Sequence, residues 1–324
     1  MWSPSLQMAQ PCEYLRHRIR APLIKSKAEQ YLNGTRHWRS LIHGNGTERP
    51  LVQRRLWLMI PFGADWEMLL LHMATLSNVT DGFIVSEARR AFMLKRKPAM
   101  LSEALQGGTL SQDLAAKTHA VVVDLQAAAN YGHCSRRAAG RQFTRCLEDW
   151  QRYSLLRKLF ELSSREDVAV LADADEISSP EVLHEITRCY PFPEHGEEGA
   201  VFGSNASSTE ISTLGKIVLS ASHYHYGLHC LVTERIFLSK QPWEHGPHVF
   251  AVSALANAFN SSGLHAIDGG PVVESKSDAA RFSAGRSANK YSAPWLDRSA
   301  WHLSSFGRPE AIVDKYESWG HHDM

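Results

Sequence analysis

The pattern of hydrophobic and polar positions changes near residue 55. Upstream, no periodicity is sustained and basic residues outnumber acidic ones, so we interpret residues 1–50 as a basic stem or poorly ordered arm. Downstream, short apolar runs typical of buried strands alternate with amphipathic segments typical of helices. We therefore expect residues 51–324 to form a single domain, with strands at 56–60, 82–85, 119–123 and 168–172 and helices at 66–76 and 141–162.

The alternation of strands and helices predicts an α/β fold. Parallel strands joined by crossover helices give a Rossmann-type, mostly parallel sheet that helices flank on both sides. The run at 168–172 is apolar throughout and is flanked by acids, which predicts a central parallel strand. The second half of the chain is less regular: we expect strands and loops that form a substrate wall at 200–250 and a mobile loop at 272–294.

Three acidic residues follow the predicted central strand: Asp173, Asp175 and Glu176. Because Ser179 and Pro180 predict the start of the next helix, these acids lie in a loop at the carboxyl edge of the sheet, where α/β folds bind ligands. Two carboxylates two positions apart can both bind one divalent cation, which takes further oxygens from a diphosphate. The alternative is that Asp173 and Asp175 only favour a turn and a helix start.

Charge and composition indicate which cellular compartment and which kinds of partner to expect. With 35 basic against 34 acidic residues, the net charge of +1 gives no reason to expect a nucleic-acid partner. The apolar runs are far shorter than the roughly 20 residues that a membrane-spanning helix needs, so we expect a membrane attachment only through a segment outside this chain. Five Asn-x-Ser/Thr sequons favour the secretory pathway, at Asn33, Asn45, Asn78, Asn205 and Asn260. Five cysteines allow at most two disulfides.

Four sequence blocks, in a fixed order between residues 55 and 323, are more specific evidence for a protein family than the acidic turn is. The first runs from Phe62 to Pro98, and Glu87, Arg90, Phe92, Lys95, Lys97 and Pro98 follow the pattern E-S-x-R-T-F-T-G-K-P-K-P. The second, Trp150-Gln151-Arg152-Tyr153, is similar to Y-Q-R-N, and the third, Leu171 to Ile177, is similar to S-D-V-D-E-I-P. The fourth, Trp301 to His321, is similar to G-W-H-L-S-Y-F-G-G-x-E-x-I-x-x-K-L-x-S-F-S-H. In these blocks the chain resembles glycosyltransferase family 17, and it departs from the family patterns at Leu70, His72, Tyr153 and Ser178.

The resemblance implies a GT-A fold, Mn2+ as cofactor and a place in the Golgi lumen or at the Golgi membrane. It also implies transfer of N-acetylglucosamine from UDP-GlcNAc to the β-linked mannose of an N-glycan core, in β-1,4 linkage and with inversion. Two other functions stay open from the residues: a phosphoesterase that uses Asp173 as nucleophile, and a catalytically inactive glycan-binding relative.

Each step of such a transfer has candidate residues in this sequence. Metal ligands would be Asp173 and Asp175, with His321 as a third, and donor binding would involve Glu87, Lys95, Lys97, Arg152 and Asp173. For the catalytic base we favour Glu310 over Glu244 and Glu176. Acceptor binding would involve Trp243 and Trp301, whose faces suit the C–H side of a sugar, together with His302.

Overall fold

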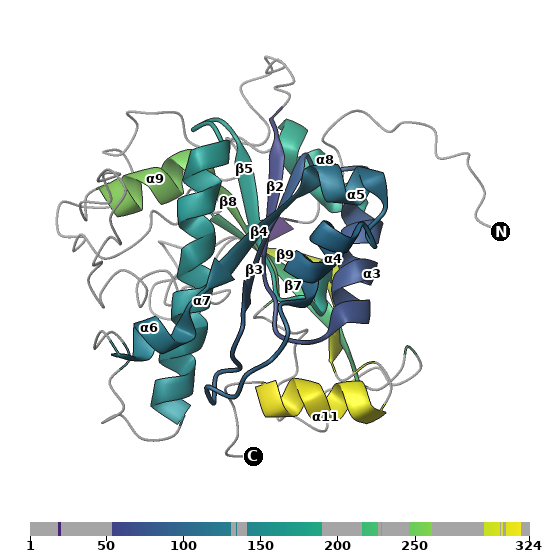
Figure 1. Cartoon of the computed structure of the whole chain (residues 1–324). Coiled ribbons are helices and arrows are strands. Elements are labelled where there is room, and N and C mark those ends of the chain that lie inside the picture. The colour runs from purple at the N-terminus through teal and green to yellow at the C-terminus, as the bar shows by residue number, and fades with distance from the viewer. Residues whose placement is uncertain are drawn as a thin grey trace, which may run out of the picture.

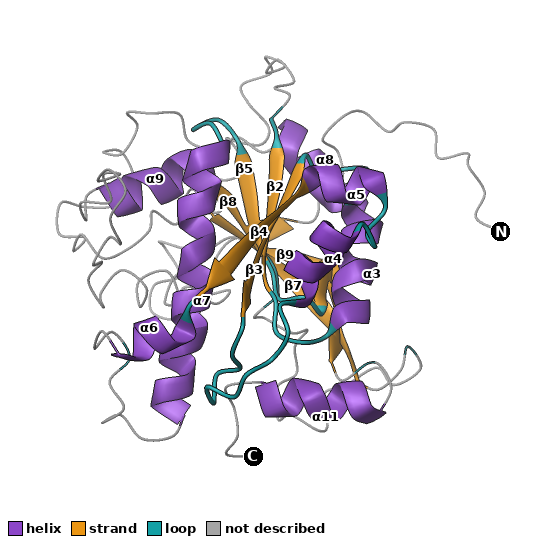
Figure 2. Ribbon diagram, in the orientation of Figure 1, coloured by secondary structure: helices purple, strands orange, loops and turns teal. Residues whose placement is uncertain are grey.

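The computed structural model describes residues 19–20, 54–130, 134, 141–189, 216–225, 228, 246–260, 295–304, 306 and 309–318. These residues form an α/β fold in which helices flank a mixed sheet, as Figures 1 and 2 show. The α/β class predicted from the sequence is therefore confirmed.

Four parallel strands make up one half of the sheet. They are β2 (Leu56–Pro61), β3 (Gly82–Ala88), β4 (Thr118–Val123) and β5 (Val168–Leu171), in the spatial order β4-β3-β2-β5. Each coincides with a strand expected from the hydrophobic pattern, within one to three residues at its ends. The acid-flanked run at 168–172 is the inner strand that the sequence predicts and is parallel to β2. The expectation of a parallel strand is wrong on its other side, where the neighbouring strand pairs with it in antiparallel orientation.

The connections between these strands are helical. They contain α3 (Trp66–Leu76), α4 (Met100–Gly107), α5 (Gln112–Lys117), α6 (Leu125–Asn130) and α7 (Arg141–Leu162). The bounds of α3 and α7 are those predicted, because both helices carry a long amphipathic pattern. The shorter α4, α5 and α6 were not predicted, since six to eight residues give too few turns for a clear period.

Alternate side chains of β2 enter two different cores. Leu58 belongs to a cluster that includes Leu69 of α3, whereas its neighbour Met59 belongs to a cluster that includes Leu159 of α7. Successive residues of a strand point to opposite faces of the sheet, so α3 and α7 cover different faces. Figure 1 shows this arrangement, with the sheet between the two helices. The acidic turn thus lies at the end of a sheet that is packed on both faces.

The second half of the chain extends the sheet in mixed orientation. It supplies β6 (Glu176–Ser178), α8 (Pro180–Cys189), β7 (Lys216–His225), β8 (His248–Ala251), α9 (Val252–Asn260), β9 (Trp295–Ser304) and α11 (Pro309–Ser318). With the short β1 (Ile19–Arg20), the strand order is β1-β9-β7-β8-β5-β2-β3-β4, and β6 pairs with β9. β7 and β8 lie in or at the end of the stretch expected to form strands and loops at 200–250.

Two further expectations can be placed only in part. The loop expected at 272–294 lies outside the described residues, as does the expected stem apart from Ile19 and Arg20, which pair with β9. The predicted start of α8 is confirmed, because the backbone N–H of Val182 donates to the hydroxyl of Ser179 at 3.4 Å. No helix in the described ranges is both long and apolar enough to span a bilayer.

Candidate active site

The acidic turn closes β5 at the carboxyl edge of the sheet. The backbone N–H of Ala172 donates to the carbonyl of Met59 at 3.1 Å, and that of Glu176 donates to the carbonyl of Asp173 at 2.9 Å. The chain order β2, β3, β4 runs outward on one side of β2, and β5 lies on the other side. The space between the ends of β2 and β5 is therefore a topological switch point, where open α/β sheets bind ligands.

Asp175 lies at the centre of a buried charge cluster. Its Oδ2 atom is 2.6 Å from Nζ of Lys315 and 3.6 Å from Nε2 of His302, and Nζ of Lys315 is 3.7 Å from Oδ2 of Asp65. Burial would raise the pKa of Asp175, but its two basic partners outweigh burial and hold the pKa well below its usual range. Burial likewise opposes the charges of Lys315 and His302, but the Asp175 carboxylate prevails and raises the pKa of both.

Asp173 is more exposed than Asp175 and has a different partner. A terminal nitrogen of Arg152 lies 3.1 Å from one carboxylate oxygen of Asp173 and 3.2 Å from the other. Arg152 also pairs with Glu148, one turn earlier on α7. The neighbouring Gln151 donates to carbonyl oxygens at the ends of β2 and β3, at 2.9 and 2.8 Å. These contacts fix the middle of α7 against the sheet edge and direct Arg152 at the acidic turn.

The backbone of the acidic turn is held from both sides. His72 of α3 is fully buried, and its Nδ1 donates to the carbonyl of Ala174, between the two aspartates, at 3.1 Å. On the other side, the backbone N–H of Leu303 in β9 donates to the carbonyl of Asp175 at 2.8 Å. Burial lowers the pKa of His72 to about 4, so its ring is neutral at pH 7. The turn is therefore supported by groups that add no charge to it.

The other residues expected to bind the donor have different environments. Glu87 is buried, and its carboxylate accepts from the backbone N–H groups of Leu101 and Ser102 at 3.1 and 2.7 Å, at the start of α4. Lys97 donates to the carbonyl of Gly63 at the end of β2, and burial lowers its pKa. Lys95 is exposed. Of these three, Lys97 contacts the segment that follows β2, and Glu87 anchors a helix; these contacts bring none of the three to the acidic turn.

The candidate bases and the acceptor-binding residues also differ from one another in burial. Glu176 is buried, and its carboxylate accepts from the backbone N–H of Asp173 at 3.2 Å, whereas Glu310 is exposed in the first turn of α11. In β9, Trp301 is 39% exposed and His302 is 9% exposed, so the strand turns the indole outward and the imidazole towards Asp175. Glu244, Trp243 and His321 lie outside the described residues.

Three residues that build the site carried no assigned role in the sequence analysis. Lys315 and Asp65 complete the charge cluster, and His72 positions the turn. The signal for Lys315 was its place in the fourth block, and Asp65 stands inside the first block. His72 stands where the chain departs from the family pattern, so no pattern match could have identified it.

The two aspartates expected to hold manganese already carry basic partners. Asp173 is paired with Arg152, and Asp175 with Lys315 and His302, so a metal ion at both carboxylates would have to displace these contacts. Within the part of the chain that the structure describes, no group of three or more His, Cys, Asp or Glu side chains is arranged to hold a metal ion. These side chains as arranged do not fit a divalent cation, and manganese stays a prediction from the resemblance.

Comparison of the sequence with known proteins adds no assignment. No protein-family model matches the chain, and no curated protein matches it either.

Proposed function

We propose that this protein is an inverting glycosyltransferase with a GT-A fold. It transfers N-acetylglucosamine from UDP-GlcNAc to the β-linked mannose of an N-glycan core, in β-1,4 linkage. The function rests on the family resemblance of the four sequence blocks, and one structural observation carries it. Residues of all four blocks, from Phe62 to Lys315, converge on the edge of the sheet at which α/β folds bind ligands.

The contacts between the blocks support this proposal. The second block reaches the first through Gln151 and the third through Arg152, while the fourth reaches the third through Lys315. The backbone of Leu94 gives independent support for the register of the first block. The family pattern has glycine at this position, and Leu94 has a φ of 62°, in the left-handed region that favours glycine.

The proposed reaction requires one bond to form and one to break. The acceptor hydroxyl oxygen attacks the anomeric carbon of the donor sugar, and the bond from that carbon to the β-phosphate oxygen breaks with its electron pair leaving on UDP. Arg152 and Lys315 supply positive charge at the acidic turn, where the diphosphate becomes more negative. The hydroxyl proton passes to Glu310, the exposed carboxylate on the helix that carries Lys315.

A lumenal location in the secretory pathway is part of the proposal. Cys134 and Cys146 form a disulfide, with Cα atoms 5.5 Å apart, and disulfides persist in oxidising compartments. Asn78 of the Asn78-Val79-Thr80 sequon is exposed just after α3, where a glycan can be attached. The remaining sequon asparagines lie outside the described residues or have side chains that the structure does not describe.

A UDP-release assay tests the function. We expect the purified chain to release UDP from UDP-GlcNAc only in the presence of an N-glycan acceptor with a free β-mannose, and Asp175→Asn to lower the rate at least about 100-fold. Asp113→Asn is the matched control, because Asp113 is exposed on α5, and it should leave the rate unchanged. Parallel reactions with Mn2+ and with EDTA test the expected metal.

The same assay discriminates the alternatives. Release of phosphate from a phosphomonoester without any acceptor would support the phosphoesterase with Asp173 as nucleophile. Binding of the N-glycan without turnover of any nucleotide sugar, with or without Mn2+, would overturn the enzyme and support the inactive glycan-binding relative.

A further inference from the structure

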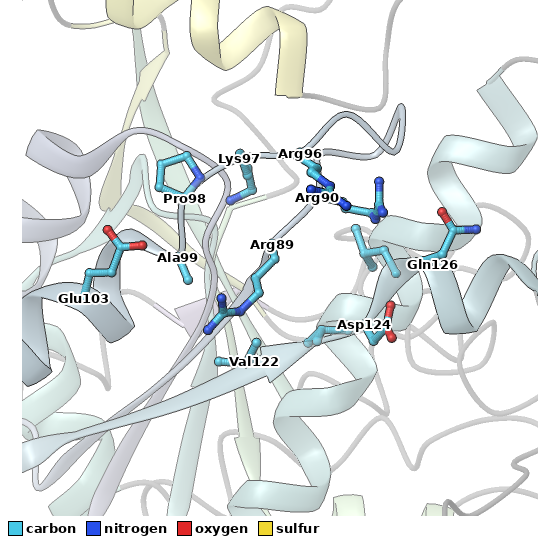
Figure 3. A pocket seen from close by; sticks show the side chains of 12 residues that line it. Arg89, Arg90, Arg96, Lys97, Pro98, Ala99, Glu103, Val122, Asp124 and Gln126 are labelled. Carbon is cyan, nitrogen blue, oxygen red and sulfur yellow. The ribbon is translucent and has the colours of Figure 1, made fainter.

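A cavity with a basic lining lies at the ends of β3 and β4. Its volume is about 590 Å3, within the 300–1,000 Å3 range typical of small-molecule sites. Four cationic side chains line it: Arg89, Arg90, Arg96 and Lys97. The lining also includes the carboxylates of Glu103 and Asp124 and the apolar side chains of Val122 and Pro98. Figure 3 shows the cations around the space, with Val122 and Asp124 across from the segment that carries Arg96 and Lys97.

The cations are brought together by a tight hairpin. Backbone hydrogen bonds join Lys97 to Arg89 at 3.0 Å and Ala91 to Lys95 at 2.8 Å, and Arg90 and Arg96 form an antiparallel bridge. Like charges placed directly opposite each other across a strand pair are destabilising. The turn of this hairpin also holds Leu94 in the left-handed conformation, which is unfavourable for a residue with a side chain. The segment thus keeps like charges together at a cost in stability.

The four cations of the lining outnumber its two carboxylates, and the Glu87 carboxylate acts on the charge of Lys97 alone among them. The structure shows no carboxylate ion-paired with Arg89, Arg90 or Arg96 among the residues it describes. The Asp124 carboxylate accepts from the backbone N–H of Ala127 at 3.0 Å, and Glu103 is exposed on α4.

One guanidinium is already positioned. Arg90 donates to the carbonyl of Leu94 at 2.8 Å, which holds its side chain in place along the hairpin. Arg89 and Arg96 are exposed, so their charged ends are accessible to a ligand from solvent. Guanidinium groups match phosphate oxygens with paired, charge-assisted hydrogen bonds.

We propose that this cavity binds a phosphate group of a small molecule, held by the guanidinium groups of Arg89, Arg90 and Arg96. The uncharged part of the ligand packs on Pro98 and on Val122, which is 49% exposed. The phosphate group can belong to a nucleotide or to a sugar phosphate. One strand, β2, separates β3 from β5, so the cavity is distinct from the acidic turn. It shares Lys97 with the residues expected to bind the donor, but the inference does not depend on the proposed transfer reaction.

Calorimetric titration with inorganic pyrophosphate, UDP and glucose 6-phosphate tests the site. We expect at least one probe to bind the full chain and the double substitution Arg89→Gln with Arg96→Gln to weaken that binding about tenfold or more, because two charge-assisted contacts are lost. Both side chains are exposed, so the fold should be retained, which a thermal melt checks. Arg157→Gln is the matched control, since Arg157 is an exposed arginine paired with Glu161 on α7.

The comparison of probes identifies the source of the phosphate. Tighter binding of UDP assigns the cavity to a nucleotide, and tighter binding of glucose 6-phosphate assigns it to a sugar phosphate. The proposal is overturned if no probe binds, or if the double variant binds each probe as tightly as the wild type does. UDP release by the transferase assay is measured separately, so failure of one proposal does not imply failure of the other.

Discussion

Replacement of Lys315 by methionine tests the charge cluster at the acidic turn most directly. Methionine keeps the length of the lysine stem and removes the ammonium that contacts Asp175 and Asp65. Removing one partner of a buried ion pair costs about 3–5 kcal/mol, because the remaining charge stays buried and uncompensated. The side chains of Lys315 and Asp175 are only 17% and 11% exposed, but His302 remains beside Asp175. We therefore expect a loss of about 3 kcal/mol, at the lower end of that range.

Urea denaturation at pH 7, followed by tryptophan fluorescence, measures this loss as a change in the free energy of unfolding. Lys158→Met is the control, because Lys158 pairs with Glu161 on the surface of α7, and exposed pairs contribute about 0.2–1 kcal/mol. Asp175→Asn combined with Lys315→Met should cost less than the sum of the two single substitutions, since each single substitution leaves the other member of the Asp175–Lys315 pair buried and charged, and the double variant removes both charges of that pair. A loss below about 1 kcal/mol for Lys315→Met, or strictly additive costs, would refute the reasoning.

Three further predictions concern stability. The pKa of His72 is about 4 in the native state and near 6.5 in the unfolded chain, so the unfolded chain binds this proton first as the pH falls. The free energy of unfolding should therefore drop by up to about 3 kcal/mol between pH 6.5 and 4. His72→Gln should remove this drop and flatten that part of the pH profile. Cys134→Ser should cost about 3 kcal/mol in urea, because the disulfide closes a loop of 12 residues; a variant as stable as the oxidised wild type would contradict this. A Cβ atom on Gly82 would lie 2.3 Å from the ring of Trp57, so Gly82→Ala should lower the melting temperature through an overpacking cost of about 1–3 kcal/mol, and an unchanged melting temperature would argue against it.

The local part of the fold could be predicted well from the sequence. The helices at 66–76 and 141–162 have their predicted bounds, because many consecutive turns repeat the same apolar period. The inner strand was recognisable from its continuous apolar run, and the start of α8 from Ser179 and Pro180. The antiparallel pairing of β8 with β5 could not be predicted, since a strand pattern carries no information about the direction of its neighbour.

The amino-acid sequence by itself determined which acids follow the inner strand and that they face the carboxyl edge of a sheet. Only the tertiary structure decided what those acids contact. Lys315 stands 140 residues from Asp175, and it reaches the turn because α11 packs at the same edge. The basic cavity likewise exists only once the hairpin at 89–97 lies against the end of β4. Hydrophobic periodicity is a pattern of residues close together in the sequence. Charges interact, and cavities form, between segments that packing brings within a few ångströms, however far apart those segments are in the sequence.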